Sequence, residues 1–307
     1  ALGNVTDFRG MTGLHEHALP FKNLADSINI RNRLIDTIEE AANETSSEER
    51  KKLLTFVVGG GGFSGTEVIA EINDFVRKHS KKYKNIHPEE IRVVLIHSKE
   101  RLMEKELSQP LSIYAEKLLR KRGVEIIFKA HLISATQQEA VLDTGEHIAA
   151  KTIISTVPSS PNPLLETLNL PCERGRVCTD KGLQVDGTQD IWAIGDCAHI
   201  PHEEGKICPA TAQFAIREAK VVAQNIMARI KNQPTRDFHF KALGMLGALG
   251  HHSAVAELFG IFKFSGFFAW TLWRMIYWVK LPGLDRKIKV ALSWLLDMLI
   301  PPEAVQL

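Results

Sequence analysis

The chain has 307 residues, of which 44% are hydrophobic and 24% are charged, and its formal net charge is +2. This composition excludes a disordered chain, and the small net charge argues against a nucleic-acid partner. The length suits two domains. The four cysteines include no C-x-x-C pair, so we expect a reducing compartment and neither a dithiol centre nor a metal site.

The first predicted elements are a helix over 24–42, where apolar residues recur at helical spacing, and a polar linker over 43–50. Residues 1–13 have neither a signal segment nor an initiating Met, so we expect the numbering to start inside a longer gene product. An apolar strand over 53–58, a glycine turn, a helix and a second strand over 91–96 then predict a βαβ unit.

The remaining elements follow from the same periodicities. We expect an amphipathic helix at 111–119, a strand at 124–128, a hairpin turn at 143–146 and a strand at 152–157. A proline-punctuated crossover at 158–163 precedes strands at 183–185 and 190–194. A helix over 212–226, behind Pro209, ends the regular part of the chain.

The glycine turn reads G-x-G-x-x-G at Gly60, Gly62 and Gly65. The first glycine permits the tight turn, the second lets the backbone approach a pyrophosphate, and the third lets the helix pack on the strand. The helix N-terminus offers N–H groups to the anion. We predict that these glycines bind a dinucleotide together with Phe63 and Ser64, the alternative being a plain structural turn.

The second strand ends in Ile96-His97-Ser98-Lys99, where an acidic residue usually bonds the ribose 2′-hydroxyl. Here no acid stands at that place. His97 and Lys99 favour a 2′-phosphate and hence NADPH, whereas Glu100 or another loop could serve NADH. The alternative is that they are ordinary loop residues.

The string from Asp190 to Ala198 reads as an apolar strand that ends in Gly195-Asp196. Open α/β sheets bind ligands at the carboxyl ends of their strands. This string resembles the second FAD motif of two-dinucleotide-binding flavoproteins, which implies that Asp196 holds the ribityl chain of the flavin. The alternative is an exposed aspartate in a turn.

Five strings in order resemble type II NADH dehydrogenase: 24–42, 53–71, 192–198, 208–226 and the tail around Trp270. The resemblance implies a two-dinucleotide-binding, Rossmann-like α/β flavoprotein fold with C-terminal amphipathic helices. Since that family opens with an FAD-binding unit, we expect an N-terminal truncation of roughly a hundred residues, the size of one such unit. The implied segments are a remnant of the FAD domain (1–50), the NAD(P)H domain (51–157), the second part of the FAD domain (158–240) and a membrane-association region (241–307).

The same resemblance assigns site residues. Glu67, just past the glycine motif, would lie where nicotinamide meets flavin and steer proton or quinone chemistry, unless it only stabilises the first turn of its helix. Ala212 and Gln213 match a segment at the flavin and quinone pocket, and Gln213 would contact the quinone. Many family members continue with a second Gln where this chain has Arg217-Glu218.

The tail over 260–279 is rich in aromatic residues and has about the length that crosses a bilayer. Lys263 and Arg274 interrupt it, so we predict a helix that lies in the membrane interface. From 258 to 307 there are six Lys or Arg against three Asp or Glu, which favours anionic lipid. The alternative is a helix buried in a core or a dimer interface, and homodimerisation is left open.

The resemblance implies electron transfer in a respiratory chain: NAD(P)H gives a hydride to FAD, which reduces a membrane quinone. The protein would be peripheral on a membrane and would face a reducing compartment, at the cytoplasmic face of a bacterium or in an organelle. One alternative is a soluble NAD(P)H oxidase or reductase with another acceptor. Another is a non-catalytic remnant that binds a nucleotide and docks on a membrane.

Overall fold

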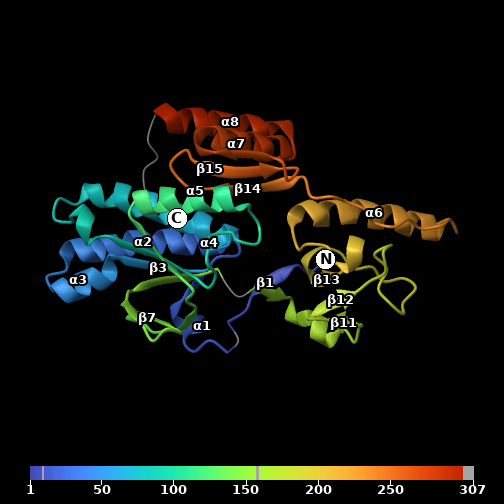
Figure 1. Cartoon of the computed structure of the whole chain (residues 1–307), viewed down its shortest axis with the longest axis horizontal. Helices are drawn as coiled ribbons and strands as arrows, with labels where there is room; N and C mark the ends of the chain where they lie inside the picture. Colours follow the sequence, from blue (N-terminus) through green and yellow to red (C-terminus); the bar gives the residue numbers. More distant parts are fainter. Residues whose placement is uncertain (9, 157–158, 300–307) are drawn as a thin grey trace. The chain divides into compact units, whose positions relative to one another are not determined.

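The computed structural model describes residues 1–8, 10–156 and 159–299 (Figure 1). The chain forms two compact units, which are described separately. The first unit comprises Ala1–Asp7 and Pro158–Leu243, and the second comprises Phe8–Val157 and Gly244–Leu307. The predicted α/β class is confirmed, because the second unit is built on a parallel sheet.

The sheet of the second unit has five parallel strands in the order β2-β9-β3-β4-β5. The strands predicted at 53–58, 91–96, 124–128 and 152–157 are all present, with their ends moved by up to two residues. The apolar runs suit a sheet that is covered on both faces. The strands are β2 (Leu19–Pro20), β3 (Thr55–Gly59), β4 (Arg92–His97), β5 (Val124–Phe128) and β9 (Thr152–Ser155).

The two faces of this sheet have different covers (Figure 1). Phe56 and Val58 pack among helices, whereas Val57, between them, packs among short strands, because successive side chains of a strand point to opposite faces. The helical cover is α2 (Leu24–Asn43), α4 (Phe63–His79) and α5 (Gln109–Lys121). The other cover is α1 (Leu14–His17) with the antiparallel strands β6 (Leu132–Ala135), β7 (Glu139–Leu142) and β8 (His147–Ala149), which contain the predicted hairpin.

Side-chain caps explain where two of the helices begin. Asn23 and Asp26 form a reciprocal capping box at the start of α2. The predicted linker at 43–50 is wrong in part, because Ser46 caps a further helix, α3 (Ser47–Leu53). Its first turn is acidic and its last turn is basic, which suits the helix dipole.

The second unit also contains the C-terminal part of the chain. An antiparallel sheet of β14 (Gly244–Ala248), β15 (Ala254–Leu258) and β16 (Phe262–Ser265) leads into α7 (Gly266–Lys280) and α8 (Leu284–Leu299). The apolar stretch 260–279 is therefore not one helix, since its first residues pair as β16 with β15. Among the residues that the structure describes, no helix is both long and apolar enough to cross a membrane.

The first unit is built on α6 (Ala212–Ile230) and two small sheets around their own core. The strands predicted at 183–185 and 190–194 are wrong. The two segments pair with each other, but only through the isolated bridge of Gln184 with Trp192, which is too short to form strands. The sheets are β1 (Asn4–Thr6) with β10 (Ser159–Pro161), and β11 (Cys172–Glu173), β12 (Arg176–Cys178) and β13 (Ala198–His199).

Short 3₁₀ helices connect these elements. They are η1 (Ser80–Lys82), η2 (Pro88–Glu90), η3 (Pro163–Thr167), η4 (Gly195–Cys197) and η5 (Glu203–Gly205). The compact units divide the chain elsewhere than the four predicted segments. Residues 8–50 and 244–307 both belong to the second unit. In the first range, α2 buries its apolar face in the core beside α4, and in the second range Leu249 and Val255 belong to the same core. Which segment serves which nucleotide stays a prediction.

Candidate functional site

The turn between β3 and α4 has the geometry that its three glycines predict. Gly60 has a φ of 111°, which L side chains rarely adopt. A Cβ on Gly65 would lie 1.6 Å from the carbonyl oxygen of Gly60, so the helix packs directly on the turn. A Cβ on Gly62 would meet only Glu106 Oε1, at 3.5 Å. Open space at the middle glycine is what a closely approaching ligand requires.

This turn borders a cavity of about 600 Å³ that lies wholly in the second unit. No side chain caps the N-terminus of α4 at Gly62, so the N–H groups of its first turn have no capping partner. Ser64 is exposed, whereas Phe63 is half-buried and packs beside Gly247 of β14. The turn thus has the features of an anion site. Binding of nucleotide by Phe63 and Ser64 stays a prediction.

His97, predicted to bind the nucleotide, uses both ring nitrogens on the protein itself. Its Nδ1 accepts a hydrogen bond from Gly61 N at 3.1 Å, and its Nε2 lies 3.0 Å from the carbonyl oxygen of Arg101. The ring is therefore neutral, with its proton on Nε2. Burial lowers the pKa of His97, which agrees with this assignment. In this position His97 holds the glycine turn in place and does not offer a cation to a phosphate.

The same cavity is lined by several charged residues, of which the sequence had indicated only Lys99. Lys99 and Lys105 line it, as do Glu104 and Glu106. His131 and Asp143 also face it and form a pair with 2.6 Å between Nδ1 and Oδ2. No sequence pattern indicated this pair, because β6 and β7 bring the two residues together only in the fold.

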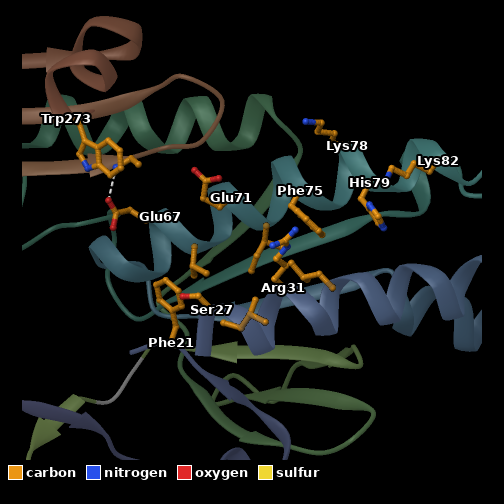
Figure 2. Close-up of a pocket in the computed structure, with 15 residues that line it drawn as sticks. Phe21, Ser27, Arg31, Glu67, Glu71, Phe75, Lys78, His79, Lys82 and Trp273 are labelled. Carbon is orange, nitrogen blue, oxygen red and sulfur yellow. Dashed lines mark hydrogen bonds between the residues drawn. The ribbon is translucent and has the colours of Figure 1, made fainter. Parts of the chain in front are cut away.

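Glu67 lies in a different cavity of the second unit, of about 910 Å³, between α2 and α4 (Figure 2). Its Oε1 accepts a hydrogen bond from Ala248 N at 2.9 Å, the dashed line in Figure 2. Burial is the main cause that raises the pKa of Glu67, and the charge of Glu71 adds to it. The carboxyl group therefore keeps its proton to a higher pH than an ordinary glutamate.

The lining of this cavity is mostly apolar at the end near Glu67 and basic at the other. Figure 2 shows Phe21, Phe75 and Trp273 along its walls, and Lys78 and Lys82 at the far end of α4 and beyond. A largely apolar cavity that carries a few acidic groups, here Glu67 and Glu71, is a common form of ligand site. The family resemblance indicated Glu67, but nothing in the sequence indicated its apolar surroundings.

In the first unit, Gly195 and Asp196 form η4, a 3₁₀ turn and not the end of a strand. Glu218 of α6 is buried, and its Oε2 accepts a hydrogen bond from Gly195 N at 2.7 Å. Burial raises the pKa of Glu218. Glu218 therefore positions the Gly-Asp turn, a function that the sequence did not reveal because the two residues are 23 positions apart.

The start of α6 is the second predicted flavin contact. Thr211 occupies the cap position without capping the helix, and its Oγ1 is buried with no hydrogen-bond partner among the described residues. Ala212 is exposed. The side-chain oxygen of Gln213 accepts a hydrogen bond from Leu243 N at 3.1 Å. Glu67 and Gln213 belong to different compact units, so neither unit alone brings the two predicted catalytic residues together.

The helices α7 and α8 form an amphipathic pair. Arg274, predicted to interrupt an apolar helix, lies over the rings of Trp270 and Trp294, at 4.3 and 4.5 Å from their centroids. Trp278 Nε1 donates a hydrogen bond to the carbonyl oxygen of Lys287 at 2.9 Å. The large apolar side chains that remain exposed on the pair are Phe267, Phe268, Met275, Tyr277, Val279, Leu284, Ile288, Leu292, Leu295 and Leu296.

Comparison with known proteins identifies two family regions in the chain. Residues 12–219 match the pyridine nucleotide-disulphide oxidoreductase family, and residues 243–300 match the NDH2 C-terminal domain. A probable NADH dehydrogenase of Dictyostelium discoideum is 27% identical over 96% of this chain and 65% of its own length. A type II NADH:quinone oxidoreductase of Staphylococcus epidermidis is 28% identical over 85% of this chain and 65% of its own length.

The chain therefore spans just under two thirds of the length of these relatives. Its fold matches the structure of NDH2 from Plasmodium falciparum in complex with NADH, with a TM-score of 0.90 and 20% identity over 99% of this chain and 78% of that one. A persulfide reductase from A. fulgidus is less similar, with a TM-score of 0.62 and 18% identity over 83% of this chain and 42% of that one. The chain thus belongs to the pyridine nucleotide-disulphide oxidoreductase family, and its C-terminal part is similar to that of NDH2.

Proposed function

We propose that this chain is part of an FAD-dependent NADH dehydrogenase that passes electrons from NADH to a membrane quinone. The observation that carries the proposal is the glycine turn, in which Gly62 leaves open space at an uncapped helix N-terminus beside a cavity. The names of the relatives support the choice of NADH and quinone. Membership of the family supports the use of FAD.

The proposed NADH site is the cavity beside the glycine turn. The N–H groups at the start of α4 would bond the pyrophosphate, and Gly62 would allow its close approach. The neutral ring of His97 keeps the Gly61 peptide in the orientation that this approach requires. His97 offers no positive charge to a 2′-phosphate. Of the two residues first considered for NADPH, only Lys99 is left, and this loss of a cation favours NADH.

The part of the FAD site that this chain supplies lies in the first unit. Asp196 would bond the ribityl chain, and the start of α6 at Ala212 and Gln213 would offer N–H groups to the flavin. The buried Oγ1 of Thr211, which has no hydrogen-bond partner in the described part of the chain, fits a polar ligand at this helix start. When bound, FAD would supply the redox chemistry, accepting a hydride from NADH. The protein's contribution is to orient the groups and to exclude water.

Reduction of a quinone takes up two protons as well as two electrons, so the site needs a proton source. Glu67 has the chemistry for this task, because its raised pKa lets it keep its proton to a higher pH than an ordinary glutamate does. The apolar walls next to it would suit a quinone ring. We propose Glu67 as the proton donor and keep Gln213 as the predicted quinone contact.

A membrane quinone requires contact with a membrane, and the α7–α8 pair is the proposed contact. Its exposed apolar side chains would enter the interface, while Arg274 is shielded between two indole rings. Aromatic residues favour this depth in the bilayer. We therefore propose a peripheral position on a membrane.

The experiment is a visible spectrum of the purified chain, followed by anaerobic addition of NADH and then of a soluble quinone. We expect bound flavin that is bleached by NADH and restored by quinone. The matched control is Gly62→Ala, which should retain flavin and lose the bleaching at low NADH concentration. NADPH in place of NADH tests the choice of nucleotide.

Other outcomes would favour the alternatives. A colourless protein that still binds NADH would favour a non-catalytic, nucleotide-binding role. Flavin that is restored by oxygen or a soluble acceptor but not by quinone, in a protein that does not bind vesicles, would favour a soluble oxidase or reductase. Either result would overturn the quinone reductase proposal.

A further inference from the structure

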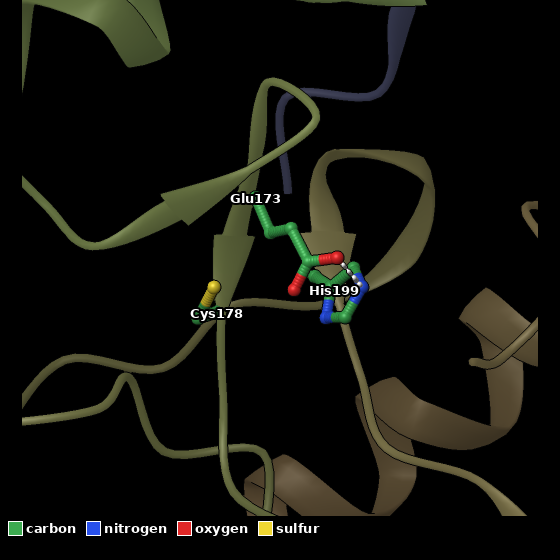
Figure 3. Close-up of side chains that lie close together, drawn as sticks. All are labelled: Glu173, Cys178 and His199. Carbon is green, nitrogen blue, oxygen red and sulfur yellow. Dashed lines mark ion pairs between the residues drawn. The ribbon is translucent and has the colours of Figure 1, made fainter. Parts of the chain in front are cut away.

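Three side chains with metal-binding atoms meet on the small sheet of the first unit, outside the proposed nucleotide sites (Figure 3). They are Glu173 of β11, Cys178 of β12 and His199 of β13. One carboxylate oxygen, the sulfur and one ring nitrogen all lie within 4.8 Å of one another. Tetrahedral metal sites of mixed sulfur, nitrogen and oxygen ligands have shorter separations, which small side-chain rotations would provide.

The register of the sheet explains why the three side chains share one face. Cys178 lies directly opposite His199 in the parallel pair of β12 and β13. Glu173 lies opposite Arg176 in the antiparallel pair of β11 and β12. Arg176 and Cys178 are two residues apart on β12, so they point to the same face. All three ligands therefore project from one side of the sheet.

The backbone that carries the ligands is well defined. β11 and β12 are joined by Arg174 and Gly175, with φ values of 51° and 76°. Positive φ at both central residues is the requirement of a two-residue hairpin turn that matches the twist of the strands. Ligands on strands with a tight turn are held more precisely than ligands on loops.

The existing contacts among the three groups leave the ligand atoms available. Glu173 Oε1 lies 3.6 Å from His199 Nε2, a long ion pair that is partly exposed to solvent. Such a pair contributes little to stability. The thiol of Cys178 is free of any disulfide and half-buried. A metal ion would replace a weak contact with three strong ones.

We propose that Glu173, Cys178 and His199 bind a zinc ion, with a water molecule as the fourth ligand. A thiolate together with an imidazole and a carboxylate is a donor set that suits Zn²⁺. On binding, the Cys178 thiol loses its proton to solvent, His199 binds as the neutral imidazole, and no electron is transferred. The ion would link the β11–β12 hairpin to β13, which directly follows η4. This site is independent of the proposed NADH dehydrogenase function.

The first test is a titration of the full chain with Co²⁺ under reducing, anaerobic conditions, because Co²⁺ replaces Zn²⁺ in such sites and its thiolate bond absorbs strongly in the near ultraviolet. We expect the absorption to saturate at one equivalent and to disappear when Zn²⁺ is added. Absence of the band would overturn the proposal.

Variants identify the ligands. Cys178→Ser should abolish the band. Loss of even an indirect partner of a metal site costs about 10- to 100-fold in affinity, so Glu173→Gln and His199→Gln should each weaken Zn²⁺ binding by at least about ten-fold. The matched control is Cys172→Ser. Cys172 pairs with Val177, and alternation along β12 puts that pair on the opposite face from Cys178.

Circular dichroism of each variant without metal checks that the fold is intact. Glu173 is exposed, so its substitution keeps the test valid if Cys178→Ser fails to fold. Equal Zn²⁺ affinity in the parent chain and in Glu173→Gln and His199→Gln would overturn the proposal. Loss of the band in Cys172→Ser with retention in Cys178→Ser would do the same.

Discussion

Single substitutions at two glycines of the β3–α4 turn should separate nucleotide binding from folding. Gly62 has a φ of −74°, which any residue adopts, and a Cβ there would meet one flexible carboxylate at an ordinary distance. Alanine at such a position stabilises the folded chain by about 0.4–1 kcal/mol, since it restricts the unfolded one. We therefore expect Gly62→Ala to fold at least as stably as the parent chain.

The same methyl group should obstruct the ligand. It would stand where a pyrophosphate approaches the N–H groups of α4, and a hydrogen bond to a charged group is worth about 1.5–3 kcal/mol. Loss of one such bond weakens binding by about 10- to 100-fold. Gly62→Ala should thus bind NADH that much more weakly while its stability is unchanged or higher.

Gly65→Ala should behave in the opposite way. Its Cβ would lie 1.6 Å from Gly60 O and 2.7 Å from Gly60 C, and these are backbone atoms that cannot rotate aside. Overpacking costs about 1–3 kcal/mol, and this contact belongs at the upper end. The better helix propensity of alanine offsets about 1 kcal/mol. We expect a net loss of about 2 kcal/mol in the free energy of unfolding.

The assay pairs chemical denaturation, followed by far-ultraviolet circular dichroism, with calorimetric titration of NADH. Equal NADH affinity in Gly62→Ala and the parent chain would refute the assignment of the turn as the pyrophosphate site. Full stability of Gly65→Ala would refute the close packing of α4 on the turn. The two variants act as controls for each other, because they make the same chemical change three residues apart.

Four further predictions follow from the other positions described above. The Gly61–His97 hydrogen bond requires a neutral ring, and burial lowers the pKa of His97. The contribution of this bond to stability is therefore complete above about pH 6.5 and is lost as the pH falls through the lowered pKa. His97→Asn, which keeps an acceptor, should remove this part of the slope in pH-dependent denaturation, and identical slopes in the variant and the parent chain would contradict the assignment. Glu218→Ala leaves Gly195 N–H unpaired and should lower both the free energy of unfolding, by about 1–3 kcal/mol, and the flavin content. Glu218→Gln should retain flavin. Equal flavin absorbance in the two variants would count against the positioning role of Glu218. Burial raises the pKa of Glu67, so reoxidation of flavin by quinone should slow as the pH rises through that pKa. In stopped-flow measurements, reoxidation in Glu67→Gln should be slow and independent of pH over this range, while reduction of the flavin by NADH should be unchanged. Phe267→Ser and Phe268→Ser remove apolar side chains that are 66% and 64% exposed, respectively. Transfer of each side chain into the membrane is worth about 1.5–3 kcal/mol, so each substitution should lower the affinity for anionic vesicles, measured by sedimentation, at least about ten-fold. The control Ile191→Ser, in the first unit, should not change this affinity.

The sequence alone determined the parts of the fold that depend on local pattern. The βαβ unit, its glycine turn and the helices at 24–42 and 212–226 were predictable, because burial on one face leaves a periodic record along the chain. The resemblance to type II NADH dehydrogenases could also be recognised from the sequence, since Gly60 to Gly65 and Gly195-Asp196 lie in contiguous motifs. The positions of Gly60 and Gly65 confirm the conformational reasons for which glycine was expected there.

The tertiary structure alone decided what depends on partners distant in sequence. The apolar run at 190–194 looks like a strand, but it pairs only with the short segment 183–185, through a single bridge, and the length of such a pairing is not specified by any local pattern. His97 looked like a phosphate ligand, yet the fold places its ring against Gly61. Glu218 gave no signal until α6 brought it to Gly195. Glu173, Cys178 and His199 have no metal-binding spacing in the sequence, and only the register of three strands brings them together.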